Sequence, residues 1–294
     1  MGPIAVEVRR GGNVEARHLV HAVAVCAGEV IAVAGDPGLS CFMRSSSKPI
    51  QALPLVRARD DLDDRHIAIA CASHRATDDQ IAAARALLAR APATEDDLEL
   101  GLQAGRPPHP IYHNCSGKHA GMLALCRAHG WPTKGYRLPD HPVQKACLAA
   151  HVEVAETSPG AAATDGCGVV TFALPLERMA TAFARLPVLP AGRRIVHAMR
   201  AHPDLVGGPD GTDFDLMRSA AGWFAKGGAE GLLCAGADDG TGVALKCVDG
   251  ASRPLGPALA AFLAPLGLDL PALARIPLRN SRGDLVGECV VASG

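Results

Sequence analysis

The sequence predicts an α+β fold in which a mainly antiparallel sheet joins the two ends of the chain and a helical region forms the middle. Three observations support this prediction. Strand-like apolar segments occur near both ends, helix-like segments lie between them, and no linker or change of composition marks a domain boundary. The 294 residues are therefore expected to form a single domain, 1–294.

The N-terminal part is predicted to form a meander of strands, because its short apolar runs are bounded by glycines. The expected strands are residues 5–9, 20–25 and 30–34. A turn at Ala27-Gly28 separates the last two. Three neighbouring strands of this kind favour antiparallel pairing.

The next segments are assigned from apolar runs and capping signals. Residues 49–56 resemble a helix, whereas the apolar run 67–73 is expected to be a strand. Thr77 and Gln80 have the spacing of a capping box, which predicts a helix to about Arg90.

Four helices are expected in the middle of the chain. The first follows His119 and stops before Gly130, and the others are residues 142–156, 176–186 and 193–201. The last third returns to strands, with Asp238-Asp239-Gly240 as a hairpin turn. Its expected elements are strands 223–226, 232–234 and 243–248, a helix at about 255–266 and a final strand at 286–291.

Composition excludes several classes of partner. The net charge is −1 and no long basic run occurs, so we expect no nucleic-acid partner and no anionic membrane surface. No apolar stretch reaches about 18 residues, and the N-terminal residues lack the apolar core of a signal peptide, so a cytoplasmic location is expected. The ten cysteines are scattered, which favours reduced thiols. The expected partners are small molecules or further copies of the chain.

The run Arg44-Ser45-Ser46-Ser47-Lys48 is the first candidate for chemistry. On a helix, Ser45 and Lys48 share a face because they are three residues apart. A serine needs a nearby base to become a nucleophile, and a lysine is a base only when its surroundings favour the neutral amine. The alternative interpretation is a polar helix start capped by serines.

A second lysine, Lys226, precedes Gly227-Gly228 at the end of a strand-like segment. A Ser-x-x-Lys helix combined with a lysine and glycine on a strand is the arrangement found in penicillin-recognising enzymes. The alternative for Lys226 is a solvated lysine before a glycine turn. His74 follows Ser73 in another polar segment, and it is a candidate base or a surface hydrogen-bonding group.

Two cysteines lie in tight polar loops. Cys115 precedes Ser116-Gly117, and Cys167 lies between two glycines. With Lys118 or His119 nearby, these thiols are candidates for a zinc site or a disulfide, and small residues that fill tight turns are the alternative. Asp165, in the same loop as Cys167, is a candidate clamp for a substrate ammonium group, or caps its own turn.

Five segments in this order resemble the Rhizobium-type L-asparaginases, also called asparaginase II. They are Arg44 to Pro49, Cys71 to His74, His113 to Met122, Asp165 to Gly168 and Ala225 to Gly231. The resemblance extends over nearly the whole chain. It implies a serine β-lactamase/glutaminase-like fold, hydrolysis of L-asparagine to L-aspartate and ammonia, and a homodimer. The chain departs from the family pattern after His74, where Arg75-Ala76 follows.

The resemblance also implies roles for single residues. The serine that matches Ser45 is the family's nucleophile, with Lys48 beside it, and Ser73 and Lys226 match a second pair. The zinc ligands that it implies are Cys115, Lys118 and Cys167, with no organic cofactor. The substrate-binding residues that it predicts are Arg44, His119 and Asp165.

Several points stay open at this stage. Either lysine can be the general base, Ser73 is a candidate proton relay, and Arg44 either holds the substrate carboxylate or pairs with a structural acid. Two alternatives to an asparaginase are a hydrolase of glutamine or another small amide, and a catalytically silent protein of the same fold that binds an amino acid or zinc.

Overall fold

The computed structural model describes residues 2–209 and 211–292, which form two compact units that alternate along the sequence. Unit 1 contains residues 2–41, 175–184 and 211–292, and unit 2 contains residues 42–174 and 185–209. No change of composition marks the crossing points, which is why the sequence leads to an expectation of one domain. Within the described residues, none of the helices is both long and apolar enough to cross a membrane.

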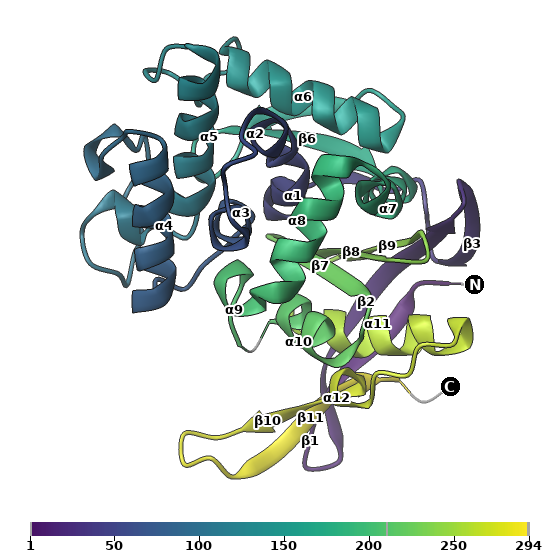
Figure 1. Cartoon of the computed structure of the whole chain (residues 1–294). Coiled ribbons are helices and arrows are strands. Elements are labelled where there is room, and N and C mark those ends of the chain that lie inside the picture. Colours follow the sequence, from purple (N-terminus) through teal and green to yellow (C-terminus); the bar gives the residue numbers. More distant parts are fainter. Residues whose placement is uncertain (1, 210, 293–294) are drawn as a thin grey trace. The chain divides into compact units, whose positions relative to one another are not determined.

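Unit 1 is built on an antiparallel sheet of eight strands. The strands are β1 (Ile4–Arg10), β2 (Asn13–Cys26), β3 (Glu29–Ala34), β7 (Trp223–Gly228), β8 (Leu232–Ala237), β9 (Thr241–Cys247), β10 (Arg275–Arg279) and β11 (Leu285–Val291). Seven of them follow the order β10-β11-β1-β2-β9-β8-β7, and β3 pairs with β2. β1 and β11 lie side by side, with Val6 opposite Val291 (Figure 1). The prediction of an antiparallel sheet that joins the chain ends is confirmed.

The core of unit 1 forms where one face of this sheet meets a helix. Val6, Val20 and Leu245 are fully buried in one cluster with Leu259 of helix α11, which lies along the sheet in Figure 1. Each such side chain contributes about 1.5–3 kcal/mol through removal of apolar surface from water. The helices of this unit are α7 (Leu176–Arg185), α10 (Thr212–Ser219), α11 (Leu255–Leu263), α12 (Pro271–Ala274) and the 3₁₀ turn η5 (Ala264–Leu266).

Unit 2 is mainly helical, with the short antiparallel pair β5 and β6. Its α-helices are α1 (Lys48–Gln51), α2 (Leu53–Ala58), α3 (Asp64–Ala70), α4 (Asp78–Arg90), α5 (Ser116–His129), α6 (Pro142–Ala155), α8 (Pro190–Ala201) and α9 (Pro203–Val206). The strands are β5 (Ala161–Thr164) and β6 (Val170–Pro175), and β4 (Ser40–Phe42) spans the sequence boundary of the units. The 3₁₀ turns are η1 (Arg44–Ser47), η2 (Glu95–Asp97), η3 (Pro110–Tyr112) and η4 (Leu186–Val188). Helix α3 packs against α4, α5 and α8.

The expected strand at 67–73 is wrong, because this segment belongs to helix α3 and the loop that follows it. Asp63 begins the helix with a capping box: its carboxylate accepts from the His66 N–H at 2.9 Å, and His66 Nδ1 accepts from the Asp63 N–H at 3.4 Å. A short buried apolar run suits a helix as well as a strand. The cap, which lies outside the apolar run, decides between them.

The capping box predicted at Thr77 is confirmed at the start of α4. The Gln80 N–H donates to Thr77 Oγ1 at 3.3 Å, and the Thr77 N–H donates to Gln80 Oε1 at 3.1 Å. The Gln80 amide also donates to the Asp204 carbonyl on α9, at 2.7 Å. A local sequence signal therefore also contributes to a tertiary contact in unit 2.

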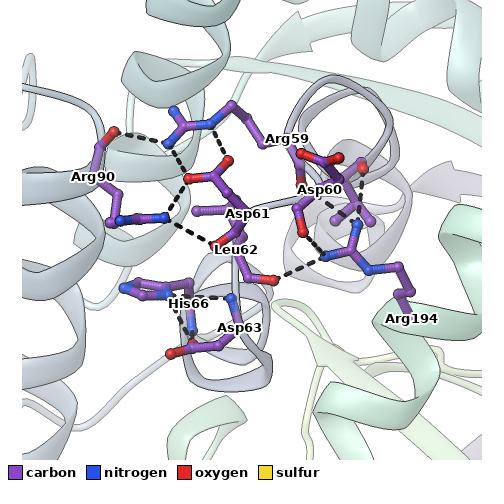
Figure 2. Close-up of polar contacts among 9 residues, drawn as sticks. Arg59, Asp60, Asp61, Leu62, Asp63, His66, Arg90 and Arg194 are labelled. Atoms are coloured by element: carbon purple, nitrogen blue, oxygen red, sulfur yellow. Dashed lines mark hydrogen bonds and ion pairs between the residues drawn. The ribbon is translucent and has the colours of Figure 1, made fainter.

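Arginine side chains secure the loop between α2 and α3, as Figure 2 shows. From α8, the Arg194 guanidinium donates to the carbonyl groups of Val56, Arg59, Asp60 and Leu62. Asp61 accepts from Arg59 and Arg90 on its two sides. These contacts satisfy backbone groups at the helix ends, which otherwise lack partners, and they hold α2 and α3 in place within unit 2.

Candidate active site

The serine run forms the short helix η1. Arg44 has a φ of 49°, which an arginine rarely adopts because its Cβ crowds the following carbonyl oxygen. Two hydrogen bonds hold this conformation: the Arg44 N–H donates to Thr171 Oγ1 at 3.1 Å, and the Arg44 carbonyl accepts from Ser47 Oγ at 2.7 Å. Ser45 is half-buried, and its Oγ has no hydrogen-bond partner within the described residues. Strain of this kind often occurs at functional sites.

Lys48 is fully buried, and its ammonium group reaches Ser73. Its Nζ donates to Ser73 Oγ at 2.9 Å and to the Ala72 carbonyl. The contact between Lys48 and Ser45 is a backbone one, from the Lys48 N–H to the Ser45 carbonyl. The structure therefore brings Lys48 to Ser73, and a buried charge of this kind requires such partners.

His74 is a neutral hydrogen-bonding residue next to Ser73. Burial, followed by the positive charge of Lys48, lowers the pKa of His74 to about 3. Its Nδ1 accepts from the Ala76 N–H at 3.1 Å, so Nε2 carries the proton and donates to Ser116 Oγ at 2.8 Å. Both ring nitrogens are engaged. The geometry therefore gives His74 a role in connecting Ser73 to the start of α5. It does not favour the alternative in which His74 is a base.

The start of α5 lies close to α3 because residue 117 is a glycine. A Cβ atom at Gly117 would lie 2.1 Å from the carbonyl oxygen of Ile69 and 2.8 Å from its Cγ1. Only a residue without a side chain allows this approach. It places Cys115 and Lys118, on either side of Gly117, against the helix that precedes Ser73.

Cys115, Lys118 and Cys167 come together in unit 2. The Lys118 ammonium donates to Cys167 Sγ at 2.9 Å. A hydrogen bond from Cys167 lowers the pKa of Cys115 well below its usual value; burial opposes this change, and Lys48 and Lys118 add to it. The same bond raises the pKa of Cys167. The arrangement favours a thiolate at Cys115 beside two lysines.

His119 is buried beside this pair of thiols, and burial lowers its pKa to about 4. The Tyr136 hydroxyl accepts from the Glu99 N–H at 2.9 Å and lies 2.7 Å from His119 Nδ1. The hydroxyl therefore donates to Nδ1, and the proton of the neutral ring lies on Nε2. Nε2 has no partner of hydrogen-bond geometry among the described residues, although Cys167 is its neighbour.

Asp165 and Arg44 form an ion pair beside the Cys167 loop. Arg44 Nε donates to Asp165 Oδ1 at 2.5 Å, and the Gly166 N–H donates to the same oxygen at 2.8 Å. Burial raises the pKa of Asp165, but Lys118, Arg44 and the Gly166 N–H lower it more, so its pKa lies below the usual value. The sequence left two roles open for Arg44, which are binding of the substrate carboxylate and pairing with an acid. In the structure, Arg44 pairs with the acid Asp165.

Lys226 lies in unit 1, where it is buried and not solvated. Its Nζ donates to Asp213 Oδ2 at 3.1 Å and to the Gly227 carbonyl at 3.0 Å. Sequence reasoning missed Asp213. Its only signal is an acidic residue at a helix start, which is common without any function because the helix dipole favours it.

Unit 1 holds a group of side chains of metal-ligating types that sequence reasoning missed. The donor atoms of His18, Cys247 and Asp249 lie within 4.8 Å of one another. The protein satisfies them internally: Asp249 accepts from Cys247 Sγ and lies 2.6 Å from His18 Nδ1, and Arg253 donates to His18 Nε2. This network closes the turn that follows β9.

The structure is similar to two crystal structures of Mglu. For the native form, the TM-score is 0.51 at 13% identity, covering 89% of this chain and 69% of that chain. For its glutamate form, the TM-score is 0.52 at 14% identity, with 86% of this chain and 62% of that chain covered. A putative beta-lactamase from Bacteroides dorei gives a TM-score of 0.48 at 12% identity, with 83% and 93% covered. The comparison with curated proteins found no match.

At sequence identities this low, the similarity shows the fold alone. The predicted serine β-lactamase/glutaminase-like fold is confirmed. The family follows from the sequence. The model of L-asparaginase II matches residues 6–291, which include the serine run, both cysteine loops and Lys226. The chain therefore belongs to the L-asparaginase II family.

Proposed function

We propose that this protein hydrolyses the side-chain amide of L-asparagine to L-aspartate and ammonia. The observation that carries the proposal is the fully buried Lys48, whose Nζ contacts Ser73 Oγ and which follows Ser45 by three residues at the end of the strained helix η1. Membership of the L-asparaginase II family supports an amidohydrolase. A lysine that is buried beside serines is the kind of group that changes protonation state during catalysis.

The proposed reaction is acyl transfer to a serine. Ser45 Oγ attacks the amide carbon, and its proton passes to Lys48 in the neutral amine form, directly or through Ser73, which is in contact with Lys48. The C–N bond then breaks, ammonia leaves with a proton from that network, and an ester of Ser45 remains. Water hydrolyses the ester, which releases aspartate and restores the serine.

The test is a coupled ammonia assay with L-asparagine and L-glutamine. The proposal expects ammonia from asparagine at a higher kcat/KM than from glutamine. A higher value for glutamine would favour the related glutamine-type hydrolase. Binding of asparagine in calorimetry without release of ammonia would contradict catalysis and favour a silent binding protein.

Recognition of the amino acid is proposed to use Asp165 and Arg44. Asp165 matches the ammonium group of asparagine, and Arg44 matches its carboxylate group. Binding would replace the single ion pair between Arg44 and Asp165 by two ion pairs with the substrate. Because its pKa is lowered, the Asp165 carboxylate stays charged at neutral pH. The stabilisation from its pair with Arg44 is present above the ordinary pKa of aspartate and is lost as the pH falls through the lowered value.

We expect Asp165→Asn to raise KM for asparagine by about tenfold or more, since a charge-assisted hydrogen bond contributes roughly 1.5–3 kcal/mol. Succinamate, which lacks the ammonium group, provides the matched comparison. The wild type should prefer asparagine to succinamate, and the variant should lose most of that preference. Equal loss of both substrates would show that Asp165 does not bind the ammonium group.

Zinc binding by Cys115, Cys167 and Lys118 is a further proposal. The two sulfur atoms suit this metal, because they are in contact and one of them is favoured as thiolate. Burial lowers the pKa of Lys118, but Cys167, Cys115 and Asp165 raise it more, so its amine is the weakest donor of the three. Lys118 must lose its proton to bind, since only the neutral amine is a ligand. When bound, zinc would supply Lewis acidity and order the two loops.

Metal analysis of protein purified without chelators checks this proposal. We expect close to one zinc ion per chain in the wild type, and loss of most of it in Cys115→Ser and in Cys167→Ser, because thiolates are the strongest ligands of the set. Cys126→Ser, which changes a buried cysteine on the same helix, is the control. An unchanged zinc content in both test variants would show that Cys115 and Cys167 do not bind zinc.

A cytoplasmic homodimer is the proposed form of the protein. The family resemblance supports the dimer, and ten cysteines without a disulfide are consistent with a reducing compartment. Light scattering with size-exclusion chromatography decides the oligomeric state, and a monomer across the working concentrations would contradict a dimer.

A further inference from the structure

Tyr136 is the largest fully buried side chain among the described residues, and it contacts His119 within unit 2. Its hydroxyl accepts from the Glu99 N–H at 2.9 Å and lies 2.7 Å from His119 Nδ1. The two rings meet edge to face, with centroids 5.4 Å apart and planes at 76°. A buried tyrosine hydroxyl needs hydrogen-bond partners, so these contacts define its role.

The position of the Tyr136 hydroxyl is fixed by contacts that do not involve His119. Glu99 holds the residues on both sides of Tyr136: its Oε1 accepts from the Gly135 N–H at 2.7 Å, and its Oε2 lies 3.4 Å from Arg137 Nε. From α6, Gln144 Nε2 donates to the Tyr136 carbonyl at 2.8 Å. The hydroxyl is therefore held in place before the histidine ring is considered.

The directions of these hydrogen bonds determine the tautomer of His119. A backbone N–H can only donate, so the Tyr136 oxygen is the acceptor toward Glu99. The single hydroxyl hydrogen then points to His119 Nδ1, which accepts it. The opposite tautomer would place a hydrogen on Nδ1 as well, and the buried O–H would be left without an acceptor, which is costly. Nε2 therefore carries the hydrogen of the neutral ring.

The Nε2–H group of His119 faces sulfur. His119 is fully buried, its Nε2 has no partner of hydrogen-bond geometry among the described residues, and Cys167 is its neighbour. Cys167 Sγ already accepts from Lys118 Nζ at 2.9 Å. A ring nitrogen that carries a hydrogen has no lone pair for a metal, but it can donate to a thiolate.

We propose that Tyr136 is a positioning residue that holds His119 as the Nε2–H tautomer, so that His119 donates to the Cys167 thiolate in the zinc site and does not itself bind zinc. The inference rests on the proposed zinc site of Cys115, Cys167 and Lys118. Hydrogen bonds to the ligands of a metal orient those ligands and increase affinity for the metal. This role of His119 differs from the substrate binding that the family resemblance implies.

NMR of the full wild-type chain tests the tautomer and the ligand set. The protein carries ¹⁵N-labelled histidine and ¹¹³Cd in place of zinc. The sequence has twelve histidines, and comparison with His119→Gln identifies the signals of His119. We expect a protonated Nε2, an unprotonated Nδ1 and no coupling between ¹¹³Cd and either nitrogen. A hydrogen on Nδ1, or a coupling to ¹¹³Cd, would overturn the inference.

Two variants of His119 distinguish a hydrogen-bond donor from a ligand. Glutamine can place an amide N–H where the ring has Nε2–H, whereas leucine cannot donate. Competition with a chromophoric chelator measures the dissociation constant for zinc. We expect it to rise about 10- to 100-fold in His119→Leu and less than about threefold in His119→Gln. An equal loss in both variants would contradict the role as a donor.

Tyr136→Phe tests the positioning role, because it removes only the hydroxyl. The dissociation constant for zinc should rise about tenfold. Tyr112→Phe is the matched control, since Tyr112 is the other tyrosine of the chain and is half-buried in unit 2, and it should bind zinc as the wild type does. Circular dichroism establishes which variants fold. A folded Tyr136→Phe protein with unchanged zinc affinity would overturn the inference, and if this variant does not fold, the wild-type ¹¹³Cd spectrum decides.

These measurements also separate failure of the inference from failure of the proposed function. A wild type that binds neither zinc nor cadmium would refute the zinc site and this role of His119 with it. A wild type that binds zinc but releases no ammonia would refute the amidohydrolase activity alone, because the tautomer and the zinc affinities are measured without substrate.

Discussion

Replacing Ser45 with alanine is expected to lower kcat for ammonia release from asparagine by about 10³-fold or more, in line with the loss of a serine nucleophile in other hydrolases. The physical reason is the loss of the only atom proposed to form the acyl ester. Ser73→Ala should lose less, because Ser73 is proposed to transfer a proton and not to form the ester. Stopped-time ammonia assays at saturating asparagine measure both effects.

Ser47→Ala is the matched control for Ser45→Ala, because it removes a hydroxyl from the same helix η1. The Ser47 hydroxyl donates to the Arg44 carbonyl, so we expect a loss of about 1 kcal/mol in stability and at most about tenfold in kcat. A Ser45→Ala protein with full activity would refute the mechanism. If Ser73→Ala lost more activity than Ser45→Ala, the nucleophile would have to be reassigned to Ser73, which already contacts Lys48.

Lys48→Met is expected to lower kcat by about 10³-fold or more while the protein stays folded. Methionine fills most of the space of the lysine side chain, and replacing a buried charge by an apolar group is often neutral for stability. The Ser73 hydroxyl and the Ala72 carbonyl lose their contact with the ammonium, so no group remains to move the serine proton. Kinetics and urea unfolding of the same preparation separate the two effects.

Lys145→Met serves as the control, since Lys145 is exposed on α6. It should keep wild-type kinetics. A Lys48→Met protein that keeps more than about a tenth of the wild-type kcat would show that general base catalysis, which typically contributes 10²–10⁴-fold, does not depend on Lys48.

The secondary-structure predictions were correct where the signal lies within a few neighbouring residues. The capping box of Thr77 and Gln80 and the glycine that ends α5 are encoded within a few residues, and both were correct. The prediction of a strand at residues 67–73 was wrong, because a continuous apolar run has no periodicity that distinguishes a buried helix from a buried strand. Strand β10 (Arg275–Arg279) was missed since it is half exposed, contains a proline and depends on pairing with β11.

The candidate site likewise has features that the sequence indicated and features that depend on tertiary contacts. The sequence indicated the residue types and their order, and Cys115, Lys118 and Cys167 do come together. It did not indicate that the Lys48 ammonium contacts Ser73, 25 residues away, because residues three apart on a helix suggested Ser45 first. The bond of His74 to Ser116 joins residues 42 apart and has no local signal.

Residue order alone established the α+β class and the family, and it indicated nearly all candidate site residues, because periodicity, caps and motif spacing are properties of neighbouring residues. The folded chain was needed to show which atoms meet: Lys48 with Ser73, Arg44 with Asp165, and Lys226 with Asp213. Each of these is a buried or half-buried charge that must find a partner once water is excluded. That requirement acts only after the core has formed, so the partner is a consequence of tertiary packing.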